Sequence, residues 1–321
     1  MTRTELLRSP APSPGGGTGP ARRALRALAI LACVPYIALK TAWVAGSEIG
    51  IPAGSALLEH RQTMIVANAV SVAADALVVV LALLLTRPWG RRVPAWLLVL
   101  PMWAATGLLA PIMTGYPAQL AVALLTGGER AAPPAEPFLH SWVFAVVYGG
   151  FILQGLSLGA LFALYARDRW GRLLRGGPGV RATALAAAAV ALVPLTLHTM
   201  WLSGATAGLS PRQTAAPDAD FAVLEAQWIV LLLVAVASTL LLVLGRPAPP
   251  RSRALLALAW TGSGAAGCWG AYLTLVTLTP TTDPGQQVTA LARLTYAAEM
   301  ITGFLLAACL AAVLRRRSAE A

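Results

Sequence analysis

The sequence predicts an all-α integral membrane protein with eight transmembrane helices. Three observations predict it: the composition, the apolar runs and the distribution of arginine. Hydrophobic residues make up 57% of the 321-residue chain and charged residues 12%, whereas about a quarter of the residues in a soluble domain are charged. A helix needs about 20 apolar residues to cross roughly 30 Å of hydrocarbon. We therefore expect the lipid bilayer to be the main partner of this chain.

Eight apolar runs are long enough to cross a bilayer, and they lie at residues 24–46, 63–86, 94–114, 139–166, 182–203, 223–245, 254–277 and 291–313. They must be helices, because lipid does not tolerate the unpaired edges of an open sheet. Residues 1–23, rich in Pro, Gly and Ser, are predicted to be a disordered cytoplasmic tail. The connection at 115–138 contains an apolar stretch, 118–126, that is too short to cross and is expected to lie in the membrane interface.

The arginines predict the orientation of the chain. Most of them lie in the tail, in the loops at 87–92, 167–181 and 246–253, and at 315–317, whereas most carboxylates lie at the opposite ends of the spans. This bias places the arginine-rich loops in the cytoplasm of a multi-pass protein of the cell membrane, and an even number of spans returns both termini to that side. Because the basic residues are scattered between apolar runs, we expect no nucleic-acid partner.

The chain also predicts an internal repeat, with a first four-helix half at 24–170, a cytoplasmic loop at 171–181 and a second half at 182–317. The matched positions are Tyr148 with Tyr296, Gly155 with Gly303, Pro35 with Pro194, Trp43 with Trp201 and Arg87 with Arg246. The two glycines follow the two tyrosines at the same spacing. Because each half has an even number of spans, the halves would be parallel repeats about an axis along the membrane normal.

Lys40 is the only lysine among the 24 basic residues, and it lies inside the first predicted span. A lysine ammonium is compact and can lose its proton, so a titratable or sterically tight role is one interpretation. The other is that Lys40 extends to the nearby outer interface. Glu299 lies at a similar depth, and we expect the two side chains to approach within ion-pair or one-water distance. Alternatively, Glu299 is a protonated carboxyl bonded to a neighbouring carbonyl.

Other polar residues also fall within the spans. Asn68, Ser71 and Asp75 stack on one helical face, which must look into the bundle because an isolated charge at mid-membrane costs at least about 2.5 kcal/mol. Asp75 is interpreted as a proton or cation site, or as a hydrogen-bonding residue between helices. His198 follows Pro194 much as Lys40 follows Pro35, and it is interpreted as a ligand or as a structural residue.

His60 and His140 are predicted at the outer ends of two spans, where their imidazoles could meet. This pair resembles the arrangement in heme A synthase, which is also built of two four-helix halves, and the resemblance implies a heme cofactor. The chain departs from that family because the sixth and eighth spans contain no histidine and the first outer loop contains no cysteine pair. In overall character, including PYIALKTAW and YARDRWGR, it resembles uncharacterised multi-pass membrane proteins of actinobacteria, which carry no assigned activity.

The sequence thus predicts a non-enzymatic protein that binds or moves a small solute or ion at a site between the two halves. The predicted binding residues are Lys40, Asn68, Asp75, His198 and Glu299. No catalytic residue, metal site or cofactor is expected, apart from the heme that the resemblance implies. The alternatives are an intramembrane heme-binding or redox enzyme and a non-catalytic scaffold or immunity protein. The glycine runs at 155–159 and 262–270 are predicted to be places of close helix packing.

Overall fold

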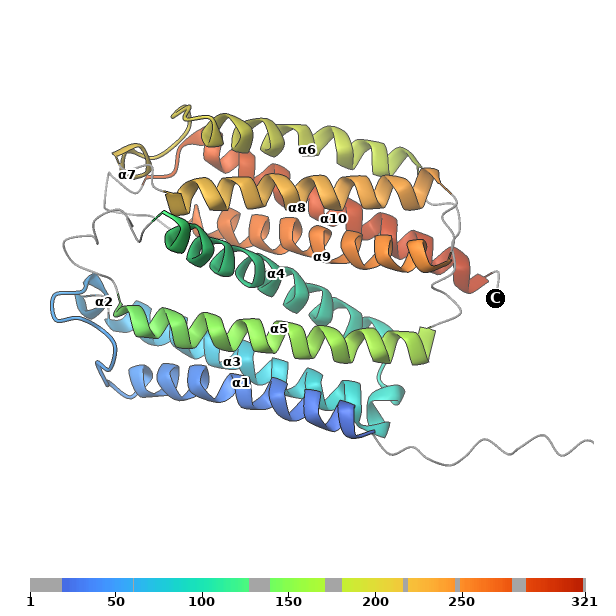
Figure 1. The fold of residues 1–321 in the computed structure, drawn as a ribbon, viewed down its shortest axis with the longest axis horizontal. Coiled ribbons are helices and arrows are strands. Elements are labelled where there is room, and N and C mark those ends of the chain that lie inside the picture. Colours follow the sequence, from blue (N-terminus) through green and yellow to red (C-terminus); the bar gives the residue numbers. More distant parts are fainter. Residues whose placement is uncertain are drawn as a thin grey trace, which may run out of the picture.

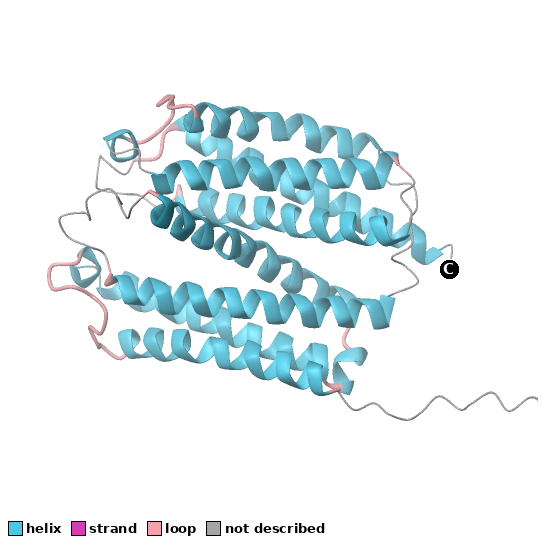
Figure 2. Ribbon diagram, viewed as in Figure 1, coloured by secondary structure: helices cyan, strands magenta, loops and turns pink. Residues whose placement is uncertain are grey.

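The described part of the chain is all helical (Figures 1 and 2). The computed structural model describes residues 19–59, 61–126, 139–170, 181–215, 219–245, 249–278 and 287–319. Its eight long helices are α1 (Pro20–Val44), α3 (Arg61–Thr86), α4 (Ala95–Leu125), α5 (Ser141–Trp170), α6 (Arg181–Leu202), α8 (Ala219–Leu244), α9 (Pro249–Val276) and α10 (Ala290–Ala319). Three short helices lie between them: α2 (Ala56–Glu59), η1 (Pro88–Arg92) and α7 (Pro211–Ala215).

Seven of the eight long helices are long and apolar enough to cross a membrane, and α9 is the one that does not meet this description. Arg251 and Arg253 lie near its beginning, and its middle is built of small and weakly polar residues. Residues 262–267 of α9 are all buried, because α4, α8 and α10 pack around it. The middle of α9 is therefore surrounded by protein and needs less apolar side-chain surface, whereas Leu258, Tyr272 and Leu275 nearer its ends are exposed.

The helices form two groups that are joined through α4. Helices α1, α3 and α5 pack together, and α6, α8, α9 and α10 form the second group. Helix α4 runs obliquely between the groups and packs more extensively on α9 than on α3 or α5 (Figure 1). Helix α1 begins and α10 ends at one end of the bundle, which we call the η1 end. Helices α2 and α7 lie at the opposite end, which we call the α2/α7 end.

The α4–α9 interface brings two backbones into direct contact. A Cβ atom added to Gly264 of α9 would lie 2.9 Å from the carbonyl oxygen of Trp103 and 3.0 Å from the Cα atom of Gly107, both on α4. Three indole N–H groups donate across the same interface: Trp103 to Ser263 (3.1 Å), Trp260 to Thr106 (2.8 Å) and Trp269 to the carbonyl of Leu108 (3.1 Å). Small residues and internal hydrogen bonds of this kind drive helix association in lipid.

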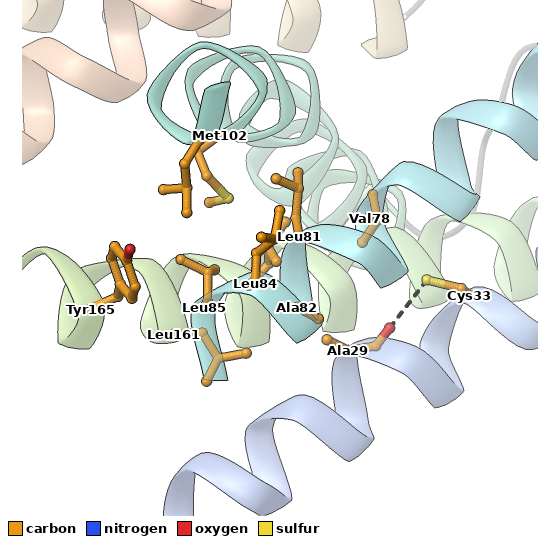
Figure 3. Close-up of a cluster of buried hydrophobic side chains, with 12 residues drawn as sticks. Ala29, Cys33, Val78, Leu81, Ala82, Leu84, Leu85, Met102, Leu161 and Tyr165 are labelled. Atoms are coloured by element: carbon orange, nitrogen blue, oxygen red, sulfur yellow. Dashed lines mark hydrogen bonds between the residues drawn. The ribbon is translucent and has the colours of Figure 1, made fainter. Parts of the chain in front are cut away.

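The core between α1, α3, α4 and α5 is apolar on the η1 side. It consists of leucine, valine, alanine and methionine side chains with Cys33 and Tyr165 (Figure 3). Leu81, Leu98, Met102 and Leu161 are almost completely buried in it. Cys33, predicted only as a residue inside an apolar span, donates to the carbonyl of Ala29 at 3.2 Å. The structure therefore places an apolar layer between the middle of the bundle and the η1 end.

Two predicted boundaries are wrong. Helix α1 begins at Pro20 rather than after residue 23, because proline suits the first position of a helix, where its missing N–H would have no partner. The stretch 118–126 is not a separate interfacial segment, since α4 continues through it to Leu125. Alanine, leucine and glutamine are strong helix formers, so the continued helix satisfies the backbone of this stretch. Residues 1–18 of the predicted tail and 171–180 of the predicted loop lie outside the described residues.

The prediction of close packing is confirmed at 262–270, but it is wrong at Gly159. Added Cβ atoms at Gly262, Gly264, Gly267 and Gly270 would all meet neighbouring atoms at 3.0 Å or less, whereas one at Gly159 meets nothing within 4 Å. Gly155 is tight, because its added Cβ would collide with the sulfur of Met113. Glycine spacing alone does not distinguish a helix face that contacts a backbone from one that does not.

This difference gives a matched pair of variants. Gly264→Ala should lower the free energy of unfolding by about 1 to 3 kcal/mol, because the new methyl group overpacks the α4–α9 contact. Gly159→Ala adds the same methyl group to a helix interior with open space and should be neutral or stabilising by up to about 1 kcal/mol. Unfolding in mixed detergent micelles measures both. Equal losses in the two variants would contradict the proposed role of the α4–α9 contact.

Candidate functional site

Three buried ionisable side chains from three helices meet in the second helix group. His198 of α6 lies between Glu225 of α8 and Glu299 of α10. Its Nδ1 atom is 2.5 Å from Oε2 of Glu225, and its Nε2 atom is 2.7 Å from Oε1 of Glu299. The exposed fractions are 3% for His198, 7% for Glu225 and 1% for Glu299. We call these three residues the triad.

The helical period of each segment places the triad inside the bundle. Helix α6 packs against both α8 and α10, and α9 in turn packs against both of those helices. The buried positions of α6 are Ala184, Ala187, Ala191, Pro194, Leu197, His198 and Trp201, which follow the spacing of one helix face. Glu299 likewise lies on α10 between buried Thr295 and Thr302. The histidine therefore faces two helices at once, and each of them supplies a carboxyl group.

The number of hydrogen-bond donors and acceptors in the triad determines its net charge. A neutral imidazole has one donor and one acceptor nitrogen, and an ionised carboxylate only accepts. Two contacts of hydrogen-bond length therefore need two protons, held either by an imidazolium between two carboxylates or by a neutral imidazole beside one carboxylic acid. Both arrangements carry a net charge of about −1, counted over the three groups. Within the described residues, neither carboxyl group has a Lys or Arg partner within 4 Å.

One acceptor of the triad has no partner. Oε2 of Glu299 is buried and accepts no hydrogen bond from any described residue. An unsatisfied buried carboxylate oxygen is costly, so this atom is the natural place for one further positive charge. Two tryptophans enclose the group: the Trp201 ring meets the His198 ring edge-on at 5.3 Å, and Trp228 lies nearly parallel to it at 6.3 Å. The triad can therefore take up a proton at a buried position.

Lys40 lies in the first helix group, away from Glu299, so the predicted direct ion pair does not form. Its Nζ atom donates to Oδ1 of Asn68 on α3 at 2.9 Å. The ammonium also lies 5.2 Å from the ring centre of Tyr36 and 4.6 Å from that of Trp43, which are cation–π distances. The pair was expected because the two residues have similar depth, but depth along the bundle does not say which helices are neighbours.

Asp75 belongs to a second polar cluster in the first group. It is 5% exposed, and its Oδ1 atom accepts a hydrogen bond from Nε2 of Gln154 on α5 at 3.1 Å. Gln154 also donates to the sulfur of Cys33 at 2.8 Å. Asn68 is buried as the predicted stripe requires, whereas Ser71 is half-buried and bonds its own helix at the carbonyl of Ala67.

The five predicted binding residues are thus distributed over the two helix groups. Lys40, Asn68 and Asp75 lie among α1, α3 and α5, whereas His198 and Glu299 lie among α6, α8 and α10. His140 is exposed before α5, and its backbone N–H donates to the carbonyl of Gly50 at 3.0 Å. His60 lies outside the described residues, so the heme pair implied by the resemblance stays a prediction.

Sequence reasoning missed Glu225 and Gln154. Glu225 lies less than two turns from the beginning of α8, where a carboxylate is expected to reach water. A comparison of spacings could have found it, because Glu225 follows His198 by nearly the same number of residues as Asn68 follows Lys40. Lys40 bonds Asn68, 28 positions later, and His198 bonds Glu225, 27 positions later. Gln154 is uncharged and so does not stand out in an apolar span, although its amide needs partners there as much as an ionisable group does.

Comparisons with protein-family models, with curated proteins and with solved structures found no match to this chain.

The hydrogen bonding of the triad predicts how substitutions there change the free energy of unfolding. His198→Leu leaves two facing carboxyl groups without their partner and should lower the free energy of unfolding by about 3 to 5 kcal/mol. Replacing all three residues by leucine removes the buried charge as well and should restore stability to the parent value or above it. Thr199→Leu, at the exposed neighbouring position, is the control. A triple variant no more stable than His198→Leu would show that the losses do not come from unpaired charge.

Proposed function

We propose that this chain is a multi-pass protein of the cell membrane that binds a proton at the triad. The observation that carries the proposal is the bridging position of His198 between Glu225 and Glu299, with one carboxylate oxygen of Glu299 unpartnered. Intramembrane ionisable groups are expensive and are typical of ion pathways and proton relays. A protein that needed only stability at this position would gain as much from apolar side chains.

The proposal includes eight membrane crossings, with α9 as the seventh. Helix α9 has 28 residues, or roughly 42 Å of helix, which is enough to cross. It packs alongside α4, α8 and α10, three helices that are apolar enough to cross on their own. Its lower hydropathy matches the burial of residues 262–267 among them. With eight crossings the chain returns to the side on which it began, and the arginine bias makes that side the cytoplasm.

The two halves are proposed to be parallel repeats, and the ends of α1 and α6 support this. The backbone N–H groups of Ala45, Gly46 and Ser47 bond the carbonyls of Thr41, Trp43 and Ala42, and those of Ser203, Gly204 and Ala205 bond Thr199, Trp201 and Met200 in the same pattern. Trp43 and Trp201 each donate to the carbonyl six residues later. Positive φ angles recur at Gly46 and Gly50 and at Gly204 and Gly208. Lys40 and His198 therefore occupy equivalent places.

The position of the triad along the bundle favours proton exchange at the α2/α7 end. His198 lies about one turn, or roughly 6 Å, from the end of α6 on that side and roughly 25 Å from its other end. The intervening η1 side is filled by apolar side chains, among them Leu306, Leu310 and Val313 of α10. Transport through the triad would therefore need a second conformation in which these layers separate. In the present conformation the shorter distance to the surface is on the outer side, and we propose that protons are exchanged there.

Proton uptake by the triad can be measured on the full chain in lipid vesicles. With a pH-sensitive dye inside the vesicles and an imposed membrane potential, we expect protein-dependent acidification or alkalinisation that is lost in Glu299→Gln and Glu225→Gln, because each amide removes a proton-accepting oxygen. Glu48→Gln, an exposed carboxyl at the α2/α7 end, is the matched control and should behave as the parent.

A chain that binds a proton without moving it gives no flux. In that case, proton release on a pH jump in detergent should still differ between the parent and Glu299→Gln. If the parent and the two triad variants agree in both measurements, the triad is not a proton site.

The proposed orientation has its own test. Reporters fused after Arg92, Arg175 or Arg253 should be active on the cytoplasmic side, and those fused after Glu129 or Asp218 on the outer side, because the arginine bias fixes the topology. The fusion after Arg253 reports the side on which α9 begins. Combined with a reporter at the C-terminus, it therefore also tests the proposed crossing by α9, because α9 and α10 must both cross to bring the C-terminus back to that side. A C-terminal reporter on the outer side would remove one crossing from the scheme.

A further inference from the structure

A second buried carboxyl group, Asp75, lies in the first helix group and is separate from the triad. It comes from α3, its amide partner Gln154 from α5 and the thiol of Cys33 from α1. The exposed fractions are 5% for Asp75, 1% for Gln154 and 0% for Cys33. These side chains lie directly beside the apolar core of α1, α3, α4 and α5, of which Cys33 is itself a member.

The hydrogen bonds of this cluster leave two acceptors and no donor. Gln154 has two N–H donors, and they are directed to Oδ1 of Asp75 at 3.1 Å and to the sulfur of Cys33 at 2.8 Å. Cys33 in turn donates to the carbonyl of Ala29. Oδ2 of Asp75 and Oε1 of Gln154 are both buried and have no hydrogen-bond partner among the described residues. The atom missing from this cluster is therefore a hydrogen-bond donor or a positive charge.

No described side chain supplies that positive charge. Lys40 donates to Asn68, which lies seven residues, or roughly 10 Å, before Asp75 on α3. Between Cys33 and Lys40 on α1, the ring of Tyr36 packs against the ring of Phe151 on α5, with 4.9 Å between the ring centres. The titratable groups of α1 that interact electrostatically with Asp75 are Cys33 and Tyr36, and neither carries a positive charge.

The other helices add no cation either. On α5, Tyr148 lies nearly two turns from Gln154 and meets Tyr116 of α4 at 4.8 Å between ring centres. A bare carboxylate with one hydrogen bond would be strongly unfavourable in these surroundings.

We propose that Asp75 and Gln154 form a second proton-binding site, in which one proton is held between Oδ2 of Asp75 and Oε1 of Gln154. One shared proton supplies the missing donor, satisfies both unpartnered oxygens and neutralises the carboxylate. A metal cation would need several more oxygen ligands, and the described residues contain no cluster of three or more His, Cys, Asp or Glu side chains able to hold one. The protein then has one proton site in each half, that of Asp75 lying deeper below the α2/α7 end than the triad.

Infrared difference spectroscopy on the full chain in lipid nanodiscs tests this site directly. At neutral pH the parent should show a protonated-carboxyl stretching band that shifts in heavy water. Asp75→Asn should abolish this band, while Glu299→Gln, Glu225→Gln and the exposed control Glu48→Gln should retain it. Different variants test the triad and Asp75, so a negative result for one site leaves the proposal for the other site standing.

Two further measurements keep the test independent of folding. Asparagine can donate to Oε1 of Gln154 as the protonated acid does, so Asp75→Asn should unfold at the parent temperature, whereas Asp75→Leu should unfold earlier. Gln154→Met keeps the carboxyl group but removes its acceptor, so the Asp75 band should persist and move to higher frequency. An unchanged spectrum in Asp75→Asn, an unmoved band in Gln154→Met, or a band that appears only when sodium ions are withdrawn would overturn the proposal, the last in favour of a bound metal cation.

Discussion

The close contact of α9 with its neighbours is the interaction on which the rest of the structure depends. Its glycines bring the backbones of α4, α8 and α10 near, and α4 joins the two helix groups through this contact. The same packing fixes α8 and α10 relative to each other. Glu225 and Glu299 therefore lie on either side of the His198 ring of α6, and the imidazole bridges the distance between their carboxyl groups. A helix with no Asp, Glu, Lys, Arg or His after Arg253 thus sets the geometry of the ionisable site.

The second constraint is burial, because a polar atom inside the bundle needs a partner within the protein. Most of the buried polar groups described here meet that need through a neighbouring helix or their own backbone. Among the exceptions, the unpartnered carboxyl oxygens of Glu299 and Asp75 and the amide oxygen of Gln154 lie at the two ionisable clusters, whereas those of Gln227, Ser252, Thr274 and Thr302 belong to uncharged side chains. Those clusters lie on the α2/α7 side of apolar layers. The molecule is therefore polarised along its length, with its chemistry toward one side.

Under the proposed repeat, the two halves share a backbone pattern at the ends of α1 and α6 but differ in chemistry. Where the second half has His198 and Glu225, the first has Lys40 and Asn68. The position that matches Glu299 is Phe151, whose ring packs on Tyr36. At this depth along the bundle the first half thus carries the ammonium group of Lys40, which is held by an amide and two aromatic rings. The second half carries two carboxyl groups and a titratable imidazole ring. At this depth the second arrangement leaves an acceptor free, Oε2 of Glu299, whereas the free acceptors of the first half lie deeper, at Asp75 and Gln154.

The sequence by itself determined the helical class, seven of the long apolar helices and the burial of Asn68, Asp75, His198 and Glu299, because hydropathy and helical period are local properties of the chain. It also predicted close packing along 262–270, since small residues gathered on a helix indicate a near neighbour. Only the tertiary structure decided the partners. Lys40 and Glu299 have similar depth but belong to different helix groups, and Glu225 looked like a residue at a water-exposed helix end until α6 placed His198 against it. Depth follows from position along one helix, whereas pairing depends on which helices are neighbours, and that is set by contacts between residues far apart in the chain.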